Sequence, residues 1–120
     1  MNVEALRQRL LAQERELVTR LKETDSAARE SQDDTVRDAG DQSLSNERTE
    51  ERFRRADLDR TTLKDVRAAL SRMDAGTFGR CVVDGEPIEE KRLAATPWTP
   101  YCLKHQERRE EASTLRPRTL

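Results

Sequence analysis

The residues with the clearest chemistry form two short pairs in the C-terminal part of the chain. Cys81-x-x-Asp84 is followed at once by Gly85, and 17 residues separate Asp84 from the second pair, Cys102-x-x-His105. Cysteine, histidine and, less often, aspartate bind structural zinc, and two such pairs at this spacing are typical of a zinc site. Gly85 can adopt the left-handed conformation of a tight turn, and the second pair suits the first turn of a helix. The spacing therefore predicts four zinc ligands.

Two other interpretations of these pairs stay open on the sequence alone. The knuckle, as we call residues 78–105, could lack a metal, with the Asp84 side chain bonded to the turn and His105 on a helix surface. Cys81 and Cys102 could instead form a disulfide, although nothing else in the chain suggests an oxidising compartment. Zinc is favoured because the turn residues around the pairs are all present.

The same stretch resembles the zinc-finger segment of a known family. From Phe78 to Cys102 the chain reads F-G-R-C-V-V-D-G-E-P-I-E-E-K-R-L-A-A-T-P-W-T-P-Y-C. This sequence resembles the DksA/TraR family of bacterial transcription factors, which bind RNA polymerase. The family usually has four cysteines, so Asp84 and His105 stand at substituted positions. The resemblance implies a zinc-binding transcription regulator, and the order of elements before the knuckle extends it over most of the chain.

Composition limits both the fold and the classes of partner. The 120 residues are enough for one domain, but 39% are charged, 3% are aromatic and the mean hydropathy is −1.00, so a large globular core is not expected. The net charge is −1 with both signs interleaved, which excludes the basic surface that sequence-independent DNA binding needs. No segment has the apolar length of a signal peptide or a membrane span. We expect a soluble, cytoplasmic protein without a membrane partner.

Two long segments have the apolar periodicity of amphipathic helices. The first runs from Val3 to about Arg29 and the second from Leu44 to about Asp74, and neither contains Gly or Pro. The second helix is expected to start before Leu44, between Val36 and Ser43, where Asp, Ser and Thr residues can act as N-caps. Gly76 is placed to cap the end of the second helix, and the turn between the helices is expected around residues 31–35. The apolar positions at three- and four-residue spacing are Val3, Leu6, Leu10, Leu17, Leu21, Phe53, Ala56, Leu63, Val66, Leu70 and Met73.

This pattern predicts an all-α dominated fold. Its main part is a long antiparallel helical hairpin, an intramolecular coiled coil, with a small zinc-knuckle-like globular end and a short C-terminal helix. Residues 1–76 form the hairpin with an acidic tip near residues 31–46, residues 77–112 form the knuckle and the C-terminal helix, and residues 113–120 form a flexible tail. The residues expected to pack a small core around the knuckle are Ile88, Trp98 and Tyr101.

The resemblance implies a functional role for the acidic tip. The family's tip motif is Asp-x-x-Asp-x-Ala, and the matching position here holds Asp38, Asp41 and, in place of the alanine, Ser43. In the family, the hairpin is pictured in the secondary channel of RNA polymerase with its tip acids near the catalytic region. The resemblance therefore implies that these three residues contact the polymerase. Without it, acids at a helix N-terminus are explained by the helix dipole, worth about 0.3–1 kcal/mol each.

Part of the family responds to the alarmone ppGpp through basic residues on the second helix and around the knuckle. The positions that align with those residues hold Thr62, Asp65, Thr96 and Gln106, and none of them is basic. Direct binding of ppGpp is therefore not expected from this chain.

The leading hypothesis is a monomeric transcription regulator, not an enzyme, that binds RNA polymerase and modulates initiation without sequence-specific contact with DNA. The first alternative is a zinc-finger module that binds nucleic acid or protein, although the balanced charge of the knuckle counts against nucleic acid. The second is a Gre-like transcript-cleavage or elongation factor, whose tip acids would help to hold a metal ion. The knuckle counts against that alternative, and one histidine without a nucleophile–base pair counts against an enzyme.

Overall fold

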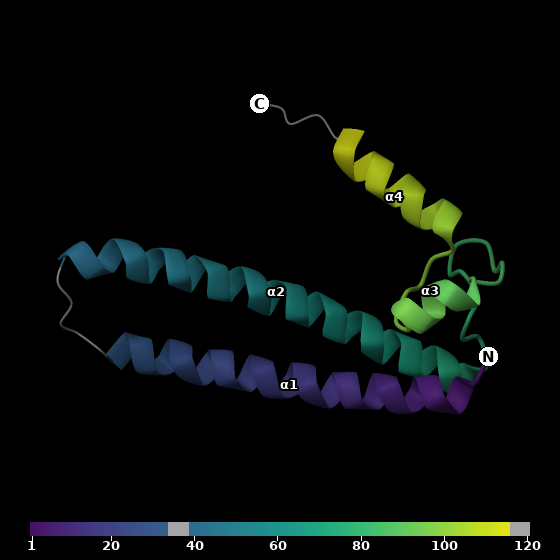
Figure 1. Cartoon of the computed structure of the whole chain (residues 1–120), viewed down its shortest axis with the longest axis horizontal. Helices are drawn as coiled ribbons and strands as arrows, with labels where there is room; N and C mark the ends of the chain where they lie inside the picture. Colours follow the sequence, from purple (N-terminus) through teal and green to yellow (C-terminus); the bar gives the residue numbers. More distant parts are fainter. Residues whose placement is uncertain (34–38, 116–120) are drawn as a thin grey trace. The chain divides into compact units, whose positions relative to one another are not determined.

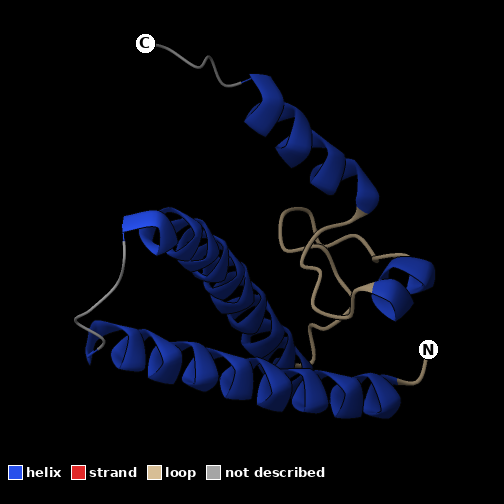
Figure 2. Ribbon diagram, turned by 60° about the vertical axis from the view of Figure 1, so that its left-hand side comes forward, coloured by secondary structure: helices blue, strands red, loops and turns tan. Residues whose placement is uncertain are grey.

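The regular secondary structure of the described residues consists of α-helices. The computed structural model describes the backbone of residues 1–33 and 39–115 and the side chains of residues 1–26 and 46–112. These residues contain four helices, α1 (Val3–Asp33), α2 (Ala39–Ala75), α3 (Glu90–Ala95) and α4 (Leu103–Leu115). They also contain one isolated antiparallel β-bridge, between Arg80 and Pro87, and loops connect α2 to α3 and α3 to α4 (Figures 1 and 2). The predicted fold class, a helical hairpin with a small knuckle and a short C-terminal helix, is confirmed.

Capping residues in the sequence set two of the helix ends. At the start of α1, the Asn2 side-chain oxygen accepts a hydrogen bond from the Ala5 backbone N–H at 3.1 Å, as an N-cap residue does. At the end of α2, Gly76 has a φ of 76°, and its N–H and that of Thr77 bond back to the carbonyls of Met73 and Arg72. This pair of bonds is the Schellman motif, so the predicted glycine cap is confirmed.

The described residues group into two compact units. The hairpin unit comprises Leu11–Lys64, and the knuckle unit comprises Met1–Leu10 together with Asp65–Leu120. In each unit a stretch of α1 lies antiparallel to a stretch of α2 (Figure 1).

The hairpin unit has a narrow apolar seam. Leu17 from α1 and Ala56 and Leu63 from α2 are its buried apolar residues among the described side chains. An ion pair joins the two helices outside the seam, with Arg20 Nη2 and Asp59 Oδ1 3.2 Å apart. Burial of a leucine side chain contributes about 1.5–3 kcal/mol, so this unit depends on few contacts.

The knuckle unit has a broader core that combines both helices with the knuckle. The helices contribute Leu6, Leu10, Val66, Ala69 and Met73, and the knuckle contributes Cys81, Ile88, Leu93 and Pro97. Polar contacts reinforce this packing: Arg9 Nη1 of α1 donates to the Ala94 carbonyl at the end of α3 at 2.8 Å, and Arg7 Nη1 lies 3.0 Å from Asp74 Oδ1. The first turns of α1 therefore belong structurally to the knuckle.

Two predicted seam positions are exposed in the structure: Val3 of α1 at 40% and Phe53 of α2 at 52%. Leu70 is half-buried, whereas its neighbour Ala69 is fully buried. Leu58, which is 67% exposed, lies two residues beyond the buried Ala56, about 200° around the helix and away from the seam. Val66 and Ala69, three residues apart, are both fully buried, so the buried face of α2 is broader in the knuckle unit. Among the described residues, no helix combines the length and the apolar character needed to span a bilayer.

Candidate metal centre

The first predicted ligand pair lies on a tight turn that backbone hydrogen bonds close from both sides. The Gly85 N–H donates to the Cys81 carbonyl at 2.9 Å, and the Cys81 N–H donates to the Glu86 carbonyl at 2.8 Å. Gly85 has a φ of 73°, in the left-handed region that favours glycine, as predicted. The Asp84 side chain completes the turn, because its Oδ1 accepts the Glu86 N–H at 3.0 Å. The turn thus fixes Cys81 and Asp84 on one side of the loop.

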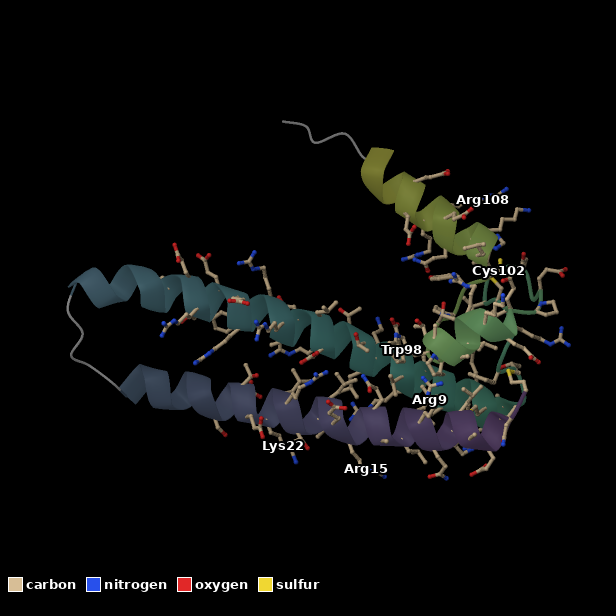
Figure 3. All side chains as sticks on the ribbon, viewed as in Figure 1. Arg9, Arg15, Lys22, Trp98, Cys102 and Arg108 are labelled. Atoms are coloured by element: carbon tan, nitrogen blue, oxygen red, sulfur yellow. The ribbon has the colours of Figure 1, made fainter. Side chains whose placement is uncertain are left out.

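The second pair lies where the chain enters α4. Cys102 immediately precedes the helix (Figure 3), and its carbonyl accepts the Gln106 N–H at 2.9 Å, which makes it the residue that starts the helical bonding. His105 therefore lies in the first turn of α4, on the same side as Cys102. The two pairs are tied together by the Val82 N–H, which donates to the Pro100 carbonyl at 2.9 Å.

The four predicted ligand residues converge on one point. The Nδ1 atom of His105 lies 3.1 Å from Cys102 Sγ, 3.5 Å from Cys81 Sγ and 3.3 Å from Asp84 Oδ2. One donor atom from each of the four residues lies within 4.8 Å of all the others. Both cysteines are free thiols, so Cys81 and Cys102 do not form a disulfide with each other.

This arrangement fits a tetrahedral zinc ion. Zinc binds sulfur at about 2.3 Å and nitrogen or oxygen at about 2.0–2.2 Å, so tetrahedral donors lie about 3.3–3.8 Å apart. The separations around His105, 3.1–3.5 Å, fall at or close to this range. The donor set of two sulfurs, one nitrogen and one oxygen is also within what zinc accepts.

The environment favours the ionised forms of two of these groups. Burial of the Cys81 thiol works to raise its pKa, but hydrogen bonds from the backbone of Cys102, Val83 and Asp84 outweigh burial and lower the pKa below the usual value. The Glu86 N–H holds the pKa of Asp84 below its usual value, against a weaker effect of burial, and the Cys81 side chain and His105 lower it further. Thiolate and carboxylate are the forms that bind a metal ion.

The other predicted site residues are only partly described. Asp38 lies outside the described residues, and Asp41 and Ser43 lie on α2 with side chains that are not described. Of the positions aligned with the family's ppGpp-contacting residues, Asp65, Thr96 and Gln106 line one cavity of about 360 Å³.

Sequence reasoning missed this cavity. Its wall also includes Trp98, which is half-buried, and Arg92, whose Nη2 atom donates to the Tyr101 carbonyl at 3.4 Å and to Thr99 Oγ1 at 3.5 Å. Trp98 follows α3 and Arg92 lies within it, whereas Asp65 lies on α2 (Figure 3). No local pattern brings residues of such different elements together, so the only signal for the cavity was the family alignment that grouped Asp65, Thr96 and Gln106.

Comparison with known proteins places the chain in a family. Residues 76–111, which include all four donors, match the family described as the prokaryotic dksA/traR C4-type zinc finger. The RNA polymerase-binding transcription factor DksA of Caulobacter vibrioides is 31% identical over 108 residues, which cover 90% of this chain and 75% of that protein. The chain belongs to the DksA/TraR family. Zinc is accordingly its cofactor, supported by both the family match and the donor cluster.

Two further relatives show how far the similarity extends. The solved structure of the transcription factor DksA2 from Pseudomonas aeruginosa has a TM-score of 0.74 and 27% identity, over 92% of this chain and 84% of that one. A protein of Aquifex aeolicus is 46% identical over 52 residues, which are 43% of this chain and 36% of that protein. That last match spans about a third of the relative's length.

Proposed function

We propose that this protein binds RNA polymerase and regulates transcription, and that it catalyses no reaction itself. The observation that carries the proposal is the match over 90% of the chain to the Caulobacter protein, whose name states that it binds RNA polymerase. The similarity in fold to DksA2, at a TM-score of 0.74, supports the same class of function.

The hairpin is the part that acts on the polymerase. It enters the secondary channel, and Asp38, Asp41 and Ser43 act from its tip on the stability of initiation complexes. α2 begins at Ala39, so the backbone of Asp41 and Ser43 belongs to the N-terminal part of this helix. Negative charge in a confined channel perturbs nearby cations and basic side chains, because interactions between charges strengthen as water is excluded. This mechanism requires no sequence-specific contact with DNA.

The role of the knuckle in this proposal is structural. Cys81, Asp84, Cys102 and His105 hold the zinc ion, which supplies a cross-link between the turn and the start of α4. The chain's own residues do the positioning: the Glu86 N–H orients the Asp84 carboxylate, and the first turn of α4 places Cys102 and His105 together. The core that the knuckle shares with the first turns of α1 and the end of α2 stabilises the knuckle unit around this site.

The decisive experiment measures binding of the purified protein to RNA polymerase core, with a known secondary-channel factor as competitor. Binding that the factor competes away supports the proposal. Tight binding without competition would keep the polymerase as a partner and remove the channel mechanism, and the absence of binding would overturn both.

A pair of matched variants separates the tip from the rest of the hairpin. Replacing both Asp38 and Asp41 by Asn should abolish the effect on transcription and leave polymerase binding unchanged. The control is replacement of Glu47 and Glu50 by Gln: these exposed acids have the same spacing on α2 and should change neither property. Parallel loss of binding and effect in the Asp38 and Asp41 variant would contradict the assignment of the tip.

The protein acts without ppGpp in this proposal. In the cavity that Asp65, Thr96 and Gln106 line, two of these side chains are neutral and the third adds a negative charge. The neighbouring Arg92 guanidinium is engaged by Tyr101 and Thr99. Calorimetric titration of the zinc-loaded protein with ppGpp should show no binding, and saturable binding that Arg92→Gln removes would overturn this part.

A further inference from the structure

The four zinc donors are held unequally. Cys81 is buried, Cys102 and His105 are half-buried, and Asp84 is exposed. Asp84 is therefore the donor that solvent and small solutes reach most readily.

Asp84 is also the donor of the four for which zinc has the weakest chemical preference. The other three residues form a set of two thiolates and one imidazole, and such a set binds zinc in sites that keep the fourth position for water or substrate. A carboxylate oxygen is a hard ligand and prefers harder cations than a zinc ion with two thiolates. The chemistry of the donors thus points to the same residue as the exposure does.

The turn does not need Asp84 to stay on the metal ion. The Asp84 Oδ1 atom has its own partner, the Glu86 N–H at 3.0 Å, and only Oδ2 faces His105, at 3.3 Å. The bonds that close the turn, from Gly85 to Cys81 and from Cys81 to Glu86, run between backbone atoms. A carboxylate that leaves the metal ion therefore leaves behind a formed turn with Cys81 still in place.

We propose that the fourth coordination position of this zinc finger is exchangeable: Asp84 yields it to a small monodentate anion while Cys81, Cys102 and His105 keep the metal ion. One singly charged ligand replaces another in the coordination sphere, and the displaced Asp84 carboxylate keeps its bond from the Glu86 N–H. The inference rests on the proposed ligand set and is independent of polymerase binding.

The test uses the full chain loaded with Co²⁺ in place of zinc, with sodium azide as the probe. Tetrahedral Co²⁺ has visible absorption bands that respond to a change of one ligand, so the readout is spectroscopic. Azide should shift these bands in the wild-type protein at a saturable concentration, with the protein remaining folded and the Co²⁺ stoichiometry remaining one per chain.

Two variants at Asp84 sharpen the result. Asp84→Asn keeps an oxygen for the Glu86 N–H but loses the anionic ligand, so azide should bind it more tightly than wild type. If Asp84 holds the position about nine-tenths of the time, the difference is about tenfold in apparent affinity. Asp84→Cys supplies a third thiolate and should abolish the response to azide.

The outcomes distinguish an error in the exchangeable fourth position from an error in the set of metal ligands. Wild-type spectra that do not change with azide, while Co²⁺ is bound, would overturn the exchangeable position and leave the ligand set intact. A response to azide that persists in Asp84→Cys would also overturn it, because azide would then displace a different residue. Failure of the wild-type chain to bind Co²⁺ at all would overturn the ligand set itself.

Discussion

In the hairpin unit, the buried side chains of Leu17, Ala56 and Leu63 come from two helices alone, whereas in the knuckle unit helices and knuckle loops meet in one core. Leu10 of α1 and Leu93 of α3 are equally buried, yet they are far apart in the sequence. The hairpin unit is thus stabilised by apolar packing that repeats along two helices. The knuckle unit is stabilised by individual core contacts and by a single set of metal donors.

This difference indicates where the chain is sensitive. A repeating seam loses one contact when one residue changes, because the neighbouring turns of the helices still pack. A zinc centre loses its function as a cross-link when one thiolate donor is lost, since structural zinc sites contribute folding free energy directly. Zinc, core substitutions, glycine substitutions and an ion pair test this contrast in order of decreasing effect.

The largest effect is expected from loss of zinc. Cys102→Ser, or treatment with a chelator, should expose the backbone amides of the knuckle unit to hydrogen exchange and leave α1 and α2 of the hairpin unit helical. Zinc contributes about 10–16 kcal/mol to apparent folding free energy in isolated zinc-finger peptides, which sets the upper scale. The measurement is hydrogen exchange of the Cys81 and Gly85 amides, both bonded within the turn. The control is Val83→Ser, since Val83 is exposed in the same loop.

Equal increases in exchange throughout both units would contradict this first prediction. They would mean that the hairpin unit has no stability of its own.

Two leucines of similar burial compare the units directly. Leu17→Ala and Leu93→Ala each remove a fully buried side chain, one in each unit, and each should cost about 2–5 kcal/mol in the free energy of unfolding. Only Leu93→Ala should also weaken zinc binding, because Leu93 belongs to the core of the knuckle unit, in which the donor Cys81 is also buried. Urea unfolding gives the first quantity, and chelator competition gives the second. Leu58→Ala, at an exposed position, should change stability by no more than about 0.5 kcal/mol.

The sequence allowed much of this fold to be predicted because its main signals are local. The first helix is expected to end near Arg29 and ends at Asp33, and the second is expected to start between Val36 and Ser43 and begins at Ala39. The cap at Gly76 was predicted in place, since it depends on one residue and its immediate neighbours. Apolar periodicity fixes which elements form, whereas helix ends without a strong cap depend on weaker preferences.

The metal centre was also predictable, and for a related reason. The positions of Cys81 and Asp84 follow from the turn at Gly85, and those of Cys102 and His105 follow from the start of a helix. The cavity beside Trp98 was not predictable from periodicity or spacing, because its wall combines residues from α2, α3, α4 and the loop between α3 and α4. Long-range packing of this kind leaves no periodic trace in the sequence.

Two glycines with the same backbone conformation distinguish the turn at the metal centre from the helix cap. Gly85 and Gly76 have φ values of 73° and 76°, and a Cβ atom at either would meet nothing within 4 Å. Alanine at either position should therefore cost only the conformational strain, about 1–2 kcal/mol. Gly85→Ala should in addition weaken zinc binding, since it strains the turn that places Cys81 and Asp84, and Gly76→Ala should not. The measurements are thermal unfolding and chelator competition, and equal zinc affinities for the two variants would show that the turn is not what places the donors.

The smallest effect is expected from the ion pair between Arg20 and Asp59 in the hairpin unit. Arg20 Nη2 lies 3.2 Å from Asp59 Oδ1, but the Arg20 side chain is 47% exposed and Glu16 lies 3.8 Å from its other nitrogen. A double-mutant cycle with Arg20→Gln and Asp59→Asn should give a coupling of about 0.2–1 kcal/mol that falls as salt is added. Glu16 keeps the arginine partly compensated when Asp59 is neutralised, so the value should lie in the lower half of that range. A coupling well above it would mean that charge pairs, rather than the apolar seam of Leu17, Ala56 and Leu63, hold this unit together, and the contrast between the two units would then need a different physical basis.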